Sequence, residues 1–188
     1  MEKKNKTLVL RILMAVCFLW MPVNGVRGLI SANVLQSGDI VAILAAALPA
    51  LAGLVLLIGA LTGSRVVMGI GCVIDLLCLG YSIYVYIMSM QQDLPAEAKK
   101  SFRGLIISTA IMLLALLVLA LACFIKRSDL ALCILAVVLF VVWFFVSRSG
   151  YAADQSQLPL MLTAGGAVLG TIITAMFFAV TKKKKAQA

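Results

Sequence analysis

The sequence predicts an all-α, polytopic integral membrane protein with six transmembrane helices in a single domain. Of its 188 residues, 64% are hydrophobic and 12% are charged, whereas about a quarter of the residues in a soluble domain are charged. Six apolar stretches are each long enough, or nearly so, to cross a bilayer, which takes roughly 18 residues or more. Strands are disfavoured, because residues 110–125, AIMLLALLVLALACFI, lack the alternating polarity of a membrane barrel.

The six spans are expected at residues 8–23, 40–62, 66–90, 104–125, 130–146 and 158–180, with short connections between them. Residues that cap or begin helices mark five of the starts: Asp39, Ser64, Ser101, Ser128 and Pro159. Residues 1–23 also have the basic start and apolar stretch of a signal peptide. Arg11 interrupts that stretch and no A-x-A pattern follows it, so we expect a retained first helix.

Residues 24–39 form the first connection and leave two interpretations open. Val26, Leu29, Ile30 and Val34 recur at helical spacing with polar residues between them. This pattern fits an interfacial helix lying on the membrane surface. It also fits a loop that packs over the end of the bundle.

The distribution of Lys and Arg predicts that both termini are cytoplasmic. Six spans place the termini on one side, and basic residues concentrate on the cytoplasmic side. Eleven of the 16 basic residues fall on the side of the termini: Lys3, Lys4, Lys6, Arg11, Arg65, Lys126, Arg127, Lys182, Lys183, Lys184 and Lys185. The other side holds Arg27, Lys99, Lys100, Arg103 and Arg148.

The basic tail at residues 181–188, TKKKKAQA, predicts contact with anionic lipid. Each Lys near such a surface gains about 1 kcal/mol, so Lys182, Lys183, Lys184 and Lys185 are expected to anchor the chain at the membrane surface. The formal net charge of +9 does not indicate nucleic-acid binding, because the positive charges are divided between two faces. The bilayer, other membrane subunits and a second copy of the chain are the partners expected.

Two resemblances bear on the topology. Residues 37–65, SGDIVAILAAALPALAGLVLLIGALTGSR, resemble the matching hairpin of HdeD-type six-span membrane proteins, a bacterial family without a clear biochemical activity. This resemblance implies a bacterial cell membrane as the location. In size and span number the chain is also similar to the substrate-binding subunits of energy-coupling-factor vitamin transporters. No residue role is taken from either family.

The residue types available argue against an enzyme. The chain has no histidine, which excludes histidine general bases, His-containing metal sites and Ser-His triads. No GxxxxGK[ST] phosphate loop occurs. The five cysteines all fall inside expected spans and form no CxxC pair, so we interpret them as small buried apolar residues. We expect no metal and no cofactor.

Asp75, inside the third span, is the candidate polar site. At 100° per residue it shares one helix face with Ser64, Met68, Gly71, Ser82, Tyr86 and Ser89. An ionised acid at mid-bilayer costs about 3 kcal/mol, so this face should point into the bundle with Asp75 neutral. Thr171 and Thr174 of the sixth span reach a similar depth and are the expected hydrogen-bond partners.

Small residues predict where helices approach closely. Gly59 and Gly63, and likewise Gly166 and Gly170, form G-x-x-x-G pairs that permit tight contact. Pro49 lies in the middle of the second span, where it either kinks a packed helix or marks a discontinuous helix at a site.

Two functions are compatible with these features. The favoured one is a non-enzymatic accessory or interaction subunit, in which Asp75 is only a structural residue. The alternative is a small transporter or substrate-binding membrane subunit with its site around Asp75.

Overall fold

The computed structural model describes residues 2–31, 40–93, 95–148 and 158–186, and the regular secondary structure within these ranges is all α-helix. The helices are α1 (Glu2–Phe18), α2 (Trp20–Ser31), α4 (Ile40–Thr62), α5 (Arg65–Met90), α6 (Ala96–Phe124), α7 (Asp129–Arg148) and α8 (Leu158–Ala186). The predicted all-α class is confirmed.

Several of these helices are long and apolar enough to cross a membrane. By length and composition, five stretches of the described residues qualify: Asn5–Arg27, Arg65–Met90, Ala96–Phe124, Asp129–Arg148 and Leu158–Lys182. The sequence of α4, Ile40–Thr62, is apolar along its length as well. These features fit an integral membrane protein.

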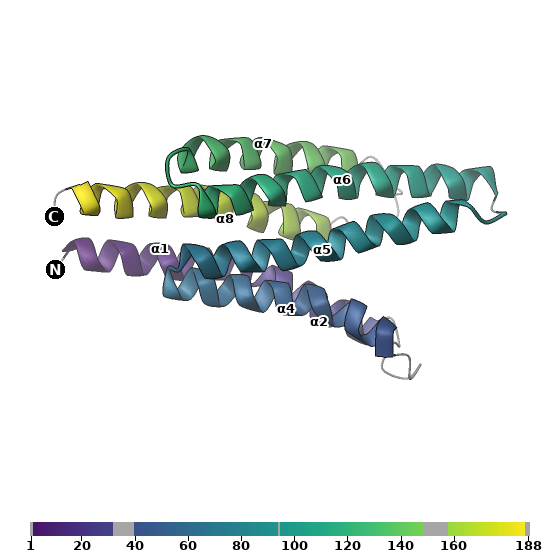
Figure 1. Ribbon diagram of the computed structural model, residues 1–188, viewed down its shortest axis with the longest axis horizontal. Coiled ribbons are helices and arrows are strands. Elements are labelled where there is room, and N and C mark those ends of the chain that lie inside the picture. Colours follow the sequence, from purple (N-terminus) through teal and green to yellow (C-terminus); the bar gives the residue numbers. More distant parts are fainter. Residues whose placement is uncertain (1, 32–39, 94, 149–157, 187–188) are drawn as a thin grey trace.

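The helices form a closed ring. Each of α4 to α8 packs against its neighbour along the chain, and α1 closes the ring by contacting both α8 and α4. Both chain termini lie at one end of this bundle, together with the α4–α5 and α6–α7 turns (Figure 1). We call this end the termini end and the other the far end, where the α5–α6 turn projects beyond the remaining helices (Figure 1).

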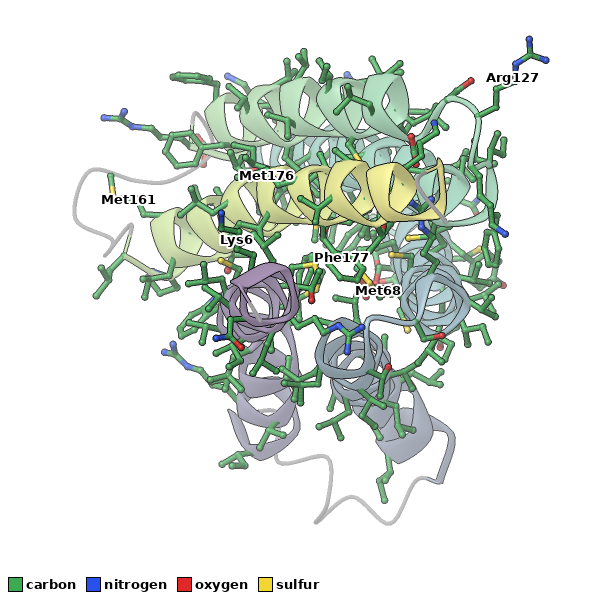
Figure 2. All side chains as sticks on the ribbon, turned by 90° about the vertical axis from the view of Figure 1, so that its left-hand side faces the viewer. Lys6, Met68, Arg127, Met161, Met176 and Phe177 are labelled. Carbon is green, nitrogen blue, oxygen red and sulfur yellow. The ribbon has the colours of Figure 1, made fainter. Side chains whose placement is uncertain are left out.

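The centre of the ring is filled by large apolar side chains. Met14, Leu56, Met68, Phe140, Phe177 and Phe178 are all buried. Figure 2, which looks onto the termini end, shows Met68 and Phe177 in the middle of the ring. The outer surface is also apolar: Leu77 is 69% exposed and Phe145 61% exposed. A soluble monomer rarely exposes a large continuous apolar surface, whereas a lipid environment favours it.

The first predicted span differs from the helices observed. Instead of one helix over residues 8–23, α1 begins at Glu2 and α2 continues to Ser31. Pro22 explains the break between them, because it lacks the N–H that would bond the Phe18 carbonyl. At the break, the Leu19 amide donates to the Val16 carbonyl at 3.3 Å, three residues back and not the four of an α-helix. Residues 24–31 are therefore helical, while residues 32–39 and the predicted cap Asp39 lie outside the described ranges.

The turn between α4 and α5 is specified by two residues. Gly63 has a φ of 68°, a left-handed conformation that glycine adopts without strain. The Ser64 amide donates to the Gly59 carbonyl and the Gly63 amide to the Ala60 carbonyl, which together make a Schellman helix end. The Ser64 hydroxyl then accepts from the Val67 amide and caps α5.

The residue predicted to mark a helix start agrees with the structure for α7 but not for α6. α6 begins at Ala96, after Pro95, so the predicted start at Ser101 is wrong and Ser101 lies inside the helix. α7 begins at Asp129, directly after the predicted start residue Ser128, whose carbonyl accepts from the Leu132 amide.

Candidate functional site

Asp75 lies in the middle of α5, which packs between α4 and α6. Its side chain is half-buried. Met68 and Gly71, on the same helix face, meet α4: a Cβ atom added to Gly71 would lie 2.8 Å from the Leu56 nitrogen. The first turns of the face that carries Asp75 therefore pack against α4.

The other polar residues of this face interact with their own helix or with α6. The Ser82 hydroxyl donates to the Cys78 carbonyl at 3.0 Å, and the Ser89 hydroxyl donates to the Val85 carbonyl at 2.9 Å. The Tyr86 ring lies 6.2 Å from the Phe102 ring of α6, measured between centroids. Both serines thus bond their own helix and not Asp75.

Thr171 and Thr174 lie on α8. Both are fully buried, and their hydroxyls donate to the Ala167 and Gly170 carbonyls, each at 2.7 Å. Thr174 also contacts Met14 Sδ of α1 at 3.4 Å. The main neighbours of α8 are α7 and α1, so the structure does not bring these threonines to Asp75.

Asp75 consequently stands apart from the residues predicted to share its site. In the part of the chain that the structure describes, no hydrogen bond or ion pair joins it to another side chain. The predicted pairing with Thr171 or Thr174 is absent because α5 and α8 occupy separate places in the ring.

A second polar group, around Asp129, lies at the termini end. Asp129 begins α7 and is 4% exposed. Arg65 Nη1 lies 3.0 Å from Oδ2 of this carboxylate, and Lys182 Nζ lies 3.6 Å from Oδ1. Oδ1 also accepts from the Leu130 amide at 2.9 Å. The carboxylate thereby joins the starts of α5 and α7 to the last turns of α8.

Arg11 belongs to the same end. Its guanidinium carbon lies 5.6 Å from the centroid of the Phe177 ring, and that of Arg65 lies 3.7 Å from the centroid of the Phe178 ring. The two ring centroids are 6.2 Å apart. Arg11 Nε is buried without a hydrogen-bond partner among the described residues. We call Arg11, Arg65, Lys182 and Asp129 the ionic cluster.

From the sequence, Arg11 and Arg65 are topology signals and Lys182 is a membrane-surface anchor as well, and the sequence does not bring them together as a cluster. Arg65 and Asp129 are 64 positions apart, and no periodic pattern connects them. One signal was present: apart from Glu2, Asp129 is the only acid that falls on the side predicted to hold the termini. An isolated acid among many basic residues is a candidate partner for one of them.

The glycine pairs lie at helix contacts of different kinds. A Cβ on Gly59 would lie 2.6 Å from the Met68 nitrogen of α5, whereas Gly63 belongs to the turn and adjoins Arg11. A Cβ on Gly166 would lie 2.7 Å from the Cys17 carbonyl oxygen, and one on Gly170 would lie 2.8 Å from the Phe18 ring. The second pair therefore lies where α8 meets α1.

A groove opens at the far end between α5 and α6. It has a volume of about 470 Å³ and is lined by Ile87, Met90, Gln91, Arg103, Ile106 and Ile107. Asp75 does not line it. No three His, Cys, Asp or Glu side chains in the described ranges are grouped so that they could hold a metal ion.

Of the predicted membrane-surface anchors, Lys182 is described in full. It is exposed, and its Nζ donates to the Lys126 carbonyl at 3.1 Å in addition to its contact with Asp129. The side chains of Lys183, Lys184 and Lys185 lie outside what the structure describes.

No family model matches this chain, and no curated protein or solved structure is similar enough to count as a match. Functional inference therefore rests on the residues and their geometry.

Proposed function

We propose that the protein is a non-enzymatic accessory or interaction subunit of a bacterial cell membrane. It crosses the bilayer six times, with α4 as the second span and with both termini in the cytoplasm. The lipid bilayer is its immediate partner, and another membrane subunit or a second copy of the chain is its protein partner.

The observation that carries this proposal is the use of polar side chains inside the apolar helices. Ser82, Ser89, Thr171 and Thr174 bond carbonyls of their own helices. Other polar groups connect helices: Trp20 Nε1 donates to Thr163 Oγ1, and the Ser108 and Ser147 hydroxyls lie 2.6 Å apart. Polar groups that hold a bundle together suit a structural role, because they are not left to bind a substrate.

A small transporter or substrate-binding subunit is the second candidate, and one observation favours it. Asp75 is a half-buried acid within a span, without a partner among the described side chains. Acids inside membrane spans often mark ion or substrate paths. In this alternative, a cation or proton would occupy the carboxylate during part of a transport cycle.

Cross-linking in native membranes followed by affinity purification tests the proposal against the alternative. The accessory function predicts a partner, or a second copy of the chain, at a fixed ratio, and the same recovery from the Asp75→Asn variant. Recovery of the uncomplexed chain, together with proton- or cation-dependent uptake in proteoliposomes that Asp75→Asn abolishes, would contradict it and support transport.

A further inference from the structure

Arg11 is the charged group of the ionic cluster that lacks a carboxylate. Asp129 already accepts from Arg65, and Lys182 approaches its other oxygen. The cluster therefore holds three cations and one anion. Arg11 is half-buried, and its Nε has no partner in the described ranges. Burying a cationic group without a partner costs free energy, so an anion at this position would be stabilised.

The surroundings of Arg11 hold its side chain in place. The guanidinium lies over the Phe177 ring, which attracts a cation through its π face. Gly63 also adjoins it, so close that a Cβ there would lie 2.5 Å from Arg11 Nε. A side chain confined by an aromatic ring and by backbone loses little further entropy when a ligand binds.

Two further groups favour an anion at this place. Arg65, at the first turn of α5, follows Gly63 by two residues. Its guanidinium lies over the ring of Phe178, the residue after Phe177. The first amides of a helix have no partner within it and carry a partial positive charge. Arg65 thus adds a second guanidinium at the start of α5 and the helix adds its positive end, although its Val67 amide already bonds the Ser64 hydroxyl; guanidinium and helix start together suit phosphate oxygens.

We propose that Arg11, with Arg65 and Lys182, binds a phosphate group at the termini end of the bundle. Guanidinium groups bind phosphate through paired hydrogen bonds, and Lys182 adds a flexible charge. Two sources carry this chemistry: the headgroup of an anionic phospholipid and a soluble phosphate compound. The lipid source depends on the proposed topology, which places this end at the membrane surface. Binding of soluble phosphate in detergent does not depend on it.

The test uses the full-length protein in two arms. In the first arm, the thermal unfolding midpoint is followed in a neutral detergent as inorganic phosphate replaces chloride at constant ionic strength. In the second, native mass spectrometry counts lipids retained from nanodiscs of phosphatidylglycerol and phosphatidylcholine. We expect saturable stabilisation in the first arm, selective retention of phosphatidylglycerol in the second, or both. A response in the lipid arm alone identifies the headgroup as the source, and one in both arms shows that free phosphate suffices.

Two variants locate the site. Arg11→Gln should weaken binding about tenfold or more, as expected for the loss of a charge-assisted pair of hydrogen bonds. Arg127→Gln is the matched control, because Arg127 is an exposed cation at the same end whose side chain points away from the bundle (Figure 2). Equal losses in both variants would overturn the proposal, since binding would then follow surface charge alone.

Folding failure of the glutamine variant would not leave the proposal undecided. Arg11→Lys keeps the charge and loses the planar pair of donors, so it should fold and bind more weakly than the native protein. The native protein alone also decides the matter. If phosphate gives no more stabilisation than chloride and the nanodiscs show no preference for the anionic lipid, the site does not exist.

Discussion

Asp129 connects three segments that are distant in the sequence, and its burial makes its partners matter for stability. Its side chain is 5% exposed, that of Arg65 is 17% exposed and that of Lys182 is 58% exposed. Removing one member of a fully buried ion pair costs about 3–5 kcal/mol. Lys182 adds little, because an ion pair with an exposed side chain is screened by solvent.

Asp129→Asn should therefore lower the free energy of unfolding by about 2 kcal/mol, since Arg65 would keep its charge and lose the carboxylate. Denaturant titration in detergent micelles measures this loss. Asp93→Asn serves as the control, because Asp93 is an exposed acid at the far end, and it should change stability by less than about 0.5 kcal/mol. Similar effects of the two substitutions would show that Asp129 is not a connecting residue.

Gly63 and Gly104 should respond to alanine with opposite signs. Gly63→Ala puts a side chain at a φ of 68° and against Arg11, at a cost of about 1–3 kcal/mol. Gly104 lies within α6 with nothing near its Cβ position, so Gly104→Ala should stabilise by up to about 1 kcal/mol through helix propensity. Unfolding midpoints of the two variants give the comparison. A neutral Gly63→Ala would contradict the turn geometry.

Asp75→Leu tests whether the Asp75 side chain forms a hydrogen bond. With no partner among the described side chains, its removal should leave the free energy of unfolding unchanged or raise it, and Asp75→Asn should be nearly neutral. A loss of about 1–3 kcal/mol on substitution by Leu, the cost of an unsatisfied buried group, would instead reveal a hydrogen bond to Asp75. Calorimetry of both variants in the same detergent distinguishes these results.

At the scale of the helices, hydropathy located the apolar centre of each element better than its ends. The prediction for residues 66–90 differs by one residue from α5, Arg65–Met90. That for 104–125 misses the first eight residues of α6, which begins at Ala96. Ala, Glu and Lys in the segment AEAKK are strong helix formers, and the segment is polar overall, so this helix continues past the apolar stretch that marks the span.

The contact between α8 and α1 gives a prediction with a control on the same helix. Gly166→Leu and Gly170→Leu should each lower the thermal unfolding midpoint by several degrees, because the new side chains would meet Cys17 or Phe18. Gly165 has nothing within 4 Å of its Cβ position, and Gly165→Leu should leave the midpoint nearly unchanged. If all three variants have the same unfolding midpoint as the native protein, α8 does not pack through this face.

At the scale of the whole molecule, the sequence does not predict which helices lie next to one another. Asp75 and the threonines of α8 were placed at similar depths, but depth does not say which helices are neighbours. In the ring, α1 lies next to α8, so Thr174 meets Met14. Arg65 likewise reaches Asp129, although 64 positions separate them. Apolar spans look alike in composition, and few of their residues identify a particular neighbour.

The arrangement of the whole chain in the membrane is the central claim, and thiol labelling tests it most directly. Single cysteines at Glu97, Arg127 and Lys184, in a background without the native cysteines, would be exposed to a membrane-impermeant reagent on intact cells. We predict labelling of Glu97→Cys from outside, and of Arg127→Cys and Lys184→Cys only after permeabilisation. Labelling of Lys184→Cys on intact cells, or protection of Glu97→Cys, would contradict a six-span bundle with cytoplasmic termini.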